Sequence, residues 1–126
     1  MYYHRKQTSL SFQDAVAKIK SELQKQGFGV LTEIDVQATL KKKLDVDYDK
    51  YVILGACSPP NAYKALQIEK NIGVYLPCNV IVYEDAGKVF ISCVLPTIAM
   101  SRIGNNSLKE VAQEVEAKLK TAVDNC

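Results

Sequence analysis

The sequence predicts an α+β fold, with helices packed on a mixed, mostly antiparallel sheet of about five strands. Three observations lead to this expectation. Short runs alternate between apolar and polar residues, longer runs carry apolar residues at helical spacing, and a turn signal at Asp85-Ala86-Gly87 separates two strand patterns. The chain has 126 residues, which suits one domain with one core over residues 1–126.

The first two elements are a strand and a helix. Residues 2–8 predict an edge strand, because neither of its alternating faces is strongly apolar. A capping box at Ser11, with Asp14 in place of the usual Glu or Gln, predicts the helix start, and Gly27 can end the helix in the left-handed conformation. The apolar stripe of this helix consists of Phe12, Ala15, Val16, Ile19 and Leu23.

A second strand and a short helix come next. Residues 28–34 predict a strand with Phe28, Val30 and Ile34 on one face. Asp35 is expected to cap the short helix. The apolar positions of that helix, one turn apart, are Val36, Leu40 and Leu44.

The middle of the chain predicts an interior strand followed by a helix. Residues 51–57 are apolar on both faces, which is typical of a strand inside the sheet. Ser58 followed by two prolines favours a helix start, because proline in the first turn loses no amide hydrogen bond. We expect this helix to run to about Lys70, before the break at Asn71-Ile72-Gly73.

The last third predicts an antiparallel hairpin over residues 78–95, in which Cys78 shares a face with Val80 and Val82. Residues 97–103 have the length of one or two helical turns. A second capping box at Ser107 predicts the closing helix. Its apolar stripe is the longest in the chain and consists of Leu108, Val111, Ala112, Val115, Leu119 and Ala122 or Val123.

Composition excludes several classes of protein. A net charge of +2 is too small to favour binding to nucleic acid or to a membrane surface, and we expect neither partner. The basic run at residues 41–43 is expected to be a solvated helix end. No apolar run has the length of a membrane helix, and the first residues do not resemble a signal peptide. The expected location is therefore the cytoplasm.

Four cysteines carry the chemistry that the sequence offers. Their spacings are long and include no CxxC, so free thiols are expected. Cys93 is expected in the core, and Cys126, as the last residue, at a frayed, exposed terminus. The single histidine, His4, argues against a finger-type zinc site and against a nucleophile–histidine pair. Phosphate-loop and calcium-loop spacings are absent as well.

Cys57 and Cys78 are the candidate site. Cys57 ends a strand one residue before a helix start, whose free amides would favour a thiolate or an anionic ligand. Cys78 follows Pro77, which lacks a backbone donor and suits the beginning of a strand. If the two strands are parallel, the thiols lie at opposite ends; if they are antiparallel, both lie at the same edge. The pattern leaves both arrangements open, and two unrelated core thiols remain the alternative.

Three stretches resemble the bacterial and archaeal family known as domain of unknown function 302: residues 27–36, residues 51–57 followed by Pro59, Ala62 and Leu66, and Gly73 with residues 76–80. The chain departs from the family pattern at Ser58-Pro59-Pro60, where a single proline preceded by asparagine is expected. The resemblance implies a small α+β domain, often dimeric in crystals, without an assigned activity. It also implies that the positions of Cys57 and Cys78 are shared by the family.

Three hypotheses for function follow. The first is a binding module, acting as a homodimer, for a soft metal ion such as zinc or copper or for a small anionic ligand. Its metal ligands would be Cys57 and Cys78, and its site would comprise Cys57, Ser58, Tyr75, Pro77, Cys78 and Asn79. The second is a thiol enzyme or redox sensor with Cys57 as the reactive thiol and Cys78 as its resolving partner. The third is a dimerising scaffold that uses a sheet edge and some of the seven tyrosines.

Overall fold

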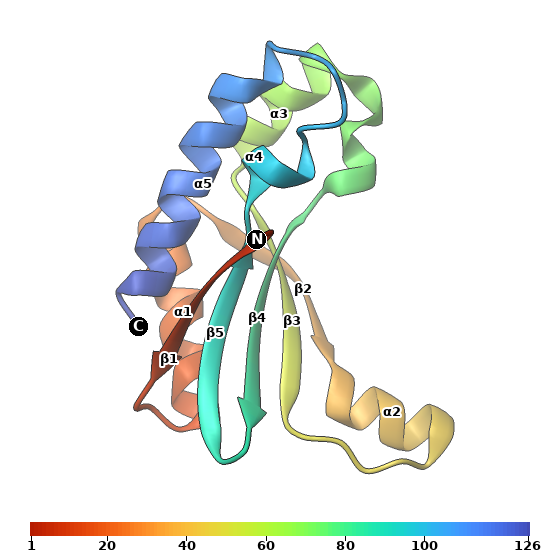
Figure 1. Cartoon of the computed structure of the whole chain (residues 1–126), viewed down its shortest axis with the longest axis vertical. Coiled ribbons are helices and arrows are strands. Elements are labelled where there is room, and N and C mark those ends of the chain that lie inside the picture. Colours follow the sequence, from red (N-terminus) through yellow and green to blue (C-terminus); the bar gives the residue numbers. More distant parts are fainter.

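The computed structural model describes residues 1–126 and has one five-stranded sheet with two long helices on one side (Figure 1). The elements follow in the order β1 (Tyr3–Thr8), α1 (Phe12–Lys25), β2 (Gly29–Asp35), α2 (Val36–Leu44), β3 (Tyr51–Cys57), α3 (Pro59–Ile68), a 3₁₀ segment (Lys70–Tyr75), β4 (Cys78–Asp85), β5 (Lys88–Val94), α4 (Pro96–Ala99) and α5 (Leu108–Asp124). No helix combines the length and apolar character that crossing a bilayer requires.

The sheet is antiparallel throughout, in the order β1-β5-β4-β3-β2. The α+β prediction is confirmed, as are the edge position of β1 and the interior position of β3. Asp85 pairs with Lys88 across the predicted hairpin turn. Ala86 and Gly87 both have positive φ, at 52° and 78°, as a two-residue type I′ turn requires.

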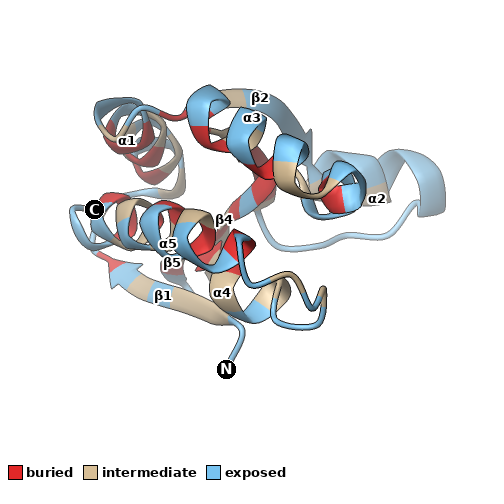
Figure 2. Ribbon diagram, turned by 90° about the horizontal axis from the view of Figure 1, so that it is seen from above, coloured by how far each residue is buried: buried red, intermediate tan, exposed pale blue.

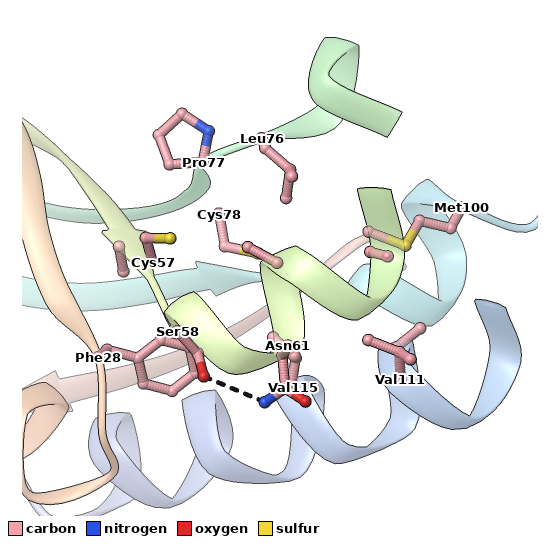
Figure 3. A pocket seen from close by; sticks show the side chains of 14 residues that line it. Phe28, Cys57, Ser58, Asn61, Leu76, Pro77, Cys78, Met100, Val111 and Val115 are labelled. Atoms are coloured by element: carbon pink, nitrogen blue, oxygen red, sulfur yellow. Dashed lines mark hydrogen bonds between the residues drawn. The ribbon is translucent and has the colours of Figure 1, made fainter. Parts of the chain in front are cut away.

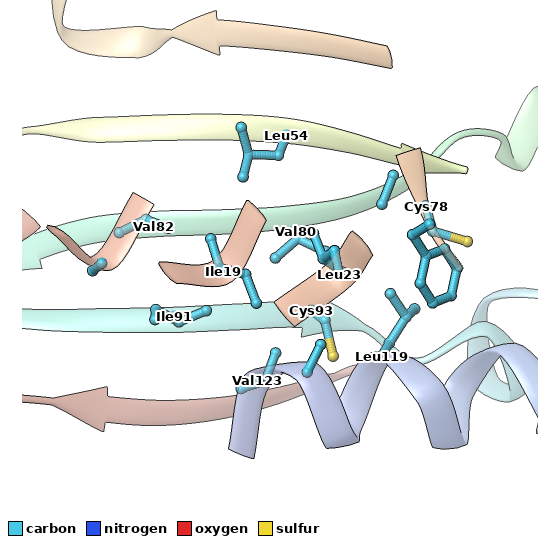
Figure 4. Close-up of a cluster of buried hydrophobic side chains, with 14 of the residues drawn as sticks. Ile19, Leu23, Leu54, Cys78, Val80, Val82, Ile91, Cys93, Leu119 and Val123 are labelled. Carbon is cyan, nitrogen blue, oxygen red and sulfur yellow. The ribbon is translucent and has the colours of Figure 1, made fainter. Parts of the chain in front are cut away.

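The core lies between the sheet and the helices α1 and α5 (Figures 2 and 4). Ile19 and Leu23 of α1 and Leu119 of α5 are completely buried against the strands. Withdrawing each such side chain from water contributes about 1.5–3 kcal/mol, which offsets part of the entropy lost on folding. The sheet residues that face these helices are Val52, Leu54, Ala56, Cys78, Val80, Val82, Val89, Ile91 and Cys93.

The opposite side of the sheet, which we call the open face, has no helix packed along it. Its side chains follow from the register and from alternation along the strands. All but Gly55 and Ser92 are half-buried or exposed. The residues of the open face are Tyr3, Arg5, Gln7, Thr32, Ile34, Tyr51, Ile53, Gly55, Asn79, Ile81, Tyr83, Asp85, Lys88, Phe90, Ser92 and Val94.

The predicted helix caps are right at two helices and wrong at two others. The hydroxyl of Ser11 accepts a hydrogen bond from the Asp14 amide at 3.1 Å, and the carboxylate of Asp35 accepts one from the Ala38 amide at 2.9 Å. Ser107 has helical dihedrals, and its side chain caps nothing. Ser58 makes no capping bond either. Its hydroxyl accepts a hydrogen bond from the side-chain amide of Asn61 instead.

The prediction that Phe28, Val30 and Ile34 share one face is wrong. The pairing of β2 with β3 shifts register between Val30 and Thr32, where one extra residue enters β2. A bulge of this kind reverses the alternation of side chains beyond it. Phe28 and Val30 therefore pack on the core, whereas Ile34 lies on the open face.

The short helix α2 stands away from the body of the molecule. None of its residues is buried. In Figure 2, α1 and α5 lie on one side of the sheet and α2 projects on the other. The basic run at residues 41–43 is exposed, as predicted, and Lys41 forms ion pairs with Asp45 and Asp47.

The expectation of a frayed C-terminus is wrong. The hydroxyl of Thr8 donates to the carbonyl oxygen of Cys126 at 3.0 Å, and the side chain of Cys126 packs partly buried against the core. The last turn of α5 therefore docks beside β1. Cys93 is buried in the core, as predicted.

Candidate functional site

The register of β3 and β4 decides between the two arrangements that the sequence left open. The strands are antiparallel, and Ala56 lies opposite Cys78. Cys57, the next residue along β3, is therefore at the same end of the sheet as Cys78. The crossover through α3 and the 3₁₀ segment therefore places the two residues at the same end of the sheet and not at opposite ends.

A small cavity lies at this end of the sheet, and both thiols line it (Figure 3). Its volume is about 30 Å³, enough for a water molecule or a single ion but not for an organic ligand. The remaining walls come from α3, from the end of α4 and from α5. The complete lining is Phe28, Ala56, Cys57, Ser58, Asn61, Ala62, Ala65, Leu76, Pro77, Cys78, Met100, Val111, Ala112 and Val115.

Four of the six predicted site residues line this cavity: Cys57, Ser58, Pro77 and Cys78. Asn79 does not, because alternation along β4 turns its side chain to the open face when Cys78 faces the helices. Tyr75 ends the 3₁₀ segment with 45% of its surface exposed and also lies outside the lining.

The two thiols have different surroundings. Cys78 is 7% exposed, and burial, with a smaller contribution from the neighbouring Cys57, raises its pKa to about 11. In the absence of a ligand, Cys78 is therefore a neutral thiol near pH 7. Cys57 ends its strand partly exposed to solvent. All four cysteines of the chain are free thiols.

The cavity offers sulfur atoms and very few other ligands. The side-chain amide of Asn61 donates to the Ser58 hydroxyl at 3.1 Å, so the one buried polar pair in the wall is engaged with itself. Met100 lines the same cavity, at the end away from the two cysteines (Figure 3). No lysine, arginine or histidine does, and no group of three or more His, Cys, Asp or Glu side chains gathers anywhere in the structure.

No local pattern in the sequence indicates the far wall of the cavity. The apolar stripe of α5 predicts that Val111 and Val115 are buried, but not that they lie across from the thiols. Met100 follows a short helical turn whose packing partner depends on the tertiary fold. Phe28 is expected in a strand, but β2 begins at Gly29. Phe28 therefore precedes the strand, and its side chain lies in the core beside the cavity.

Comparison with known proteins points to one family. The family described as Domain of unknown function DUF302 matches residues 4–126. The crystal structure of an uncharacterized conserved protein DUF302 from Bacillus stearothermophilus is similar, with a TM-score of 0.95 and 29% sequence identity, over 100% of this chain and 98% of that chain. No curated protein matches the chain significantly.

Proposed function

We propose that this chain, which belongs to the family Domain of unknown function DUF302, binds one soft metal ion such as copper(I) between Cys57 and Cys78. The observation that carries the proposal is the antiparallel register, which sets both residues at the edge of one cavity. The function is proposed for the reducing cytoplasm, where thiols stay available as ligands.

The character of the cavity favours a soft cation over the other ligands considered. Thiolate and thioether sulfurs select copper(I), and Met100 supplies a third sulfur in the lining. Zinc normally takes four ligands from Cys, His and carboxylates, and the lining holds only two such residues. A small anion would find no cationic side chain in the wall, and the volume suits a single ion.

Metal binding at Cys78 must displace a proton, since the thiolate is the ligand. The pKa of about 11 means that this proton is held tightly near neutrality. Below that pKa, each proton released on binding should lower the affinity for the metal by about tenfold per pH unit. This dependence separates ligation by thiols from adventitious binding at exposed carboxylates, which are already ionised near neutrality.

A thiol redox function is the second candidate. It is supported by a partly exposed Cys57 beside a buried Cys78, the arrangement of an attacking thiol and its resolving partner. The raised pKa of Cys78 makes it a slow resolving thiol. Peroxide treatment followed by peptide mapping tests this function: a Cys57–Cys78 disulfide supports it, and stepwise oxidation of Cys57 alone contradicts it.

The test of metal binding is a titration of the reduced protein with copper(I) against a colorimetric copper(I) chelator. We expect one ion per chain, and a loss of affinity of at least about tenfold in both Cys57→Ser and Cys78→Ser. Cys93→Ser is the matched control, because Cys93 is a buried thiol of the same sheet that does not line the cavity. Equal copper(I) affinity in the wild type and in Cys57→Ser would refute the proposal.

A homodimer completes the proposed function. Its support is the open face, which a single chain leaves uncovered. Metal binding does not require the second copy, because both sulfurs belong to one chain. The two proposals can therefore fail separately.

A further inference from the structure

The open face has the composition of a protein interface. Tyr51, Tyr83 and Phe90 lie side by side on three strands, with neighbouring rings 5.5 and 5.4 Å apart and nearly parallel. In the next row, Ile34, Ile53 and Ile81 lie opposite one another. Aromatic and aliphatic side chains with few charges are typical of the core of an interface rather than of a solvated sheet face.

Three side chains of the open face are charged: Asp85 and Lys88, which are opposite in charge and pair beside the hairpin turn, and Arg5, which is already engaged. The guanidinium of Arg5 lies 4.6 Å from the centre of the Phe90 ring and donates a hydrogen bond to the Tyr83 hydroxyl at 3.0 Å. The guanidinium thus extends the aromatic surface instead of interrupting it. Because Asp85 and Lys88 offset each other at the hairpin end, the face has a small net charge, and a second copy of the same face would meet little electrostatic repulsion.

Helix α2 and the loop after it, residues 36–50, form what we call the α2 arm. The arm projects on the side of the open face (Figure 2). Leu44 is 65% exposed, and Val46 and Tyr48 are exposed as well. An amphipathic helix keeps its apolar side chains in water at a cost, so a helix without buried residues is a candidate for contact with another chain.

The available area suits a dimer only if both features take part. Five strands about 4.8 Å apart and about 20 Å long give the sheet a footprint of about 480 Å². A nine-residue helix adds about 135 Å², from a length of about 13.5 Å and a width of about 10 Å. A stable interface buries about 600–1,000 Å² on each partner. The sheet alone falls below this range, and the sheet with the arm reaches it.

We propose that a second copy of this chain docks on the open face, with the α2 arm of each copy closing on the other. A two-fold dimer requires each partner to offer both halves of the contact. Each copy has one apolar projection, the arm, and one apolar socket, a groove of about 270 Å³ on the open face lined by Tyr3, Tyr51, Ile81 and Tyr83 among others. Two twisted sheets can pack face to face at about 30°.

This inference deepens the proposed homodimer by naming its surface, and sedimentation velocity over a concentration series tests both. The wild type is expected to be a dimer at low micromolar concentration. Ile34→Glu, on the sheet, and Leu44→Glu, on the arm, should each raise the dimer dissociation constant by about tenfold or more, since each places a charge in the apolar contact. Ile34 and Leu44 are 48% and 65% exposed in the single chain, so both variants should fold.

Leu66→Glu is the matched control. Leu66 lies on α3 and is 42% exposed, so the same substitution is made at an exposed leucine outside the proposed contact. Circular dichroism confirms that each variant is folded. A wild type that stays monomeric at high micromolar concentration overturns the homodimer itself. A dimer that Ile34→Glu and Leu44→Glu leave as tight as Leu66→Glu does overturns the assignment to the open face and keeps the homodimer.

Discussion

A Cβ atom placed on Gly55 would lie 2.7 Å from Cγ of Pro77 and would overlap the Thr32 hydroxyl. The pyrrolidine ring therefore packs directly on the backbone of β3. Pro77 is joined to Leu76 by a cis peptide bond and precedes Cys78. The glycine in an otherwise apolar strand allows this close approach and positions the segment that delivers Cys78 to the cavity.

Gly55→Ala should destabilise the protein by about 1–3 kcal/mol, because a methyl group must push Pro77 and Thr32 aside. The shift of Pro77 should also weaken copper(I) binding. Gly29→Ala is the control, since a Cβ there meets no atom within 4 Å. Urea denaturation of both variants measures the effect. Equal stability of Gly55→Ala and the wild type would show that the contact is loose.

Alkylation should discriminate among the four thiols. Burial raises the pKa of Cys78 and Cys126 to about 11 and that of Cys93 to about 12, so few of these thiols are ionised at pH 8. The thiolate is the reactive form. We expect iodoacetamide to modify Cys57 first in the native protein. Mass spectrometry of the peptides measures the extent of modification at each cysteine. Modification of Cys78 or Cys126 before Cys57 would contradict the described surroundings of these thiols.

Stability should fall in alkaline solution, and Cys93 should contribute to the fall. Its pKa is raised from an ordinary 9.0 to about 12, so above pH 9 the unfolded chain releases a proton that the folded chain keeps. The free energy of unfolding then decreases by up to about 1.4 kcal/mol per pH unit between these two values. In Cys93→Ala this slope should be smaller. Urea denaturation at pH 7, 9 and 10.5 measures it, and an unchanged slope would contradict the prediction.

Stability in acid should depend on Glu22, which is 3% exposed in α1. Its carboxylate accepts a hydrogen bond from Lys25 at 2.7 Å and is paired with Lys18. The bond from Lys25 chiefly lowers the Glu22 pKa below its ordinary 4.5, with a further contribution from Lys18. The stabilisation is thus complete above pH 4.5 and is lost as the pH falls through the lowered value.

The test is to compare Glu22→Gln with the wild type at pH 7 and at pH 3. The variant should be less stable at pH 7, and the difference should shrink at pH 3, where the wild-type carboxylate takes up its proton. Glu114→Gln, at an exposed position of α5, is the control and should leave the pH dependence as it is. A difference that stays constant with pH would mean that Glu22 acts through packing alone.

The element boundaries were predictable because their signals are local. The cap at Ser11, the turn at Ala86-Gly87 and the stripe of α5 each depend on neighbours within a few residues. The capping bonds expected at Ser58 and Ser107 do not form. The Ser58 hydroxyl accepts a hydrogen bond from the side chain of Asn61, and Ser107 itself has helical dihedrals.

The site was predictable only in part, because its geometry depends on pairing between distant strands. Cys57 and Cys78 were identified by their positions at strand ends, but strand direction had to come from the fold. Asn79 and Tyr75 are sequence neighbours of Cys78, but alternation along β4 and the exposed end of the 3₁₀ segment place both side chains outside the cavity. Met100 and Val115 belong to segments whose packing position depends on the tertiary fold, and no local sequence pattern predicts it.

The most direct measurement is X-ray absorption spectroscopy at the copper edge of the protein loaded with one equivalent of copper(I). In the wild type and in Cys93→Ser, we expect a first coordination shell made up entirely of sulfur atoms. In Cys57→Ser and in Cys78→Ser, we expect this shell to contain one sulfur atom fewer. A shell of nitrogen or oxygen atoms in the wild type, or an identical sulfur shell in Cys57→Ser, would contradict the claim that these two thiols form the metal site.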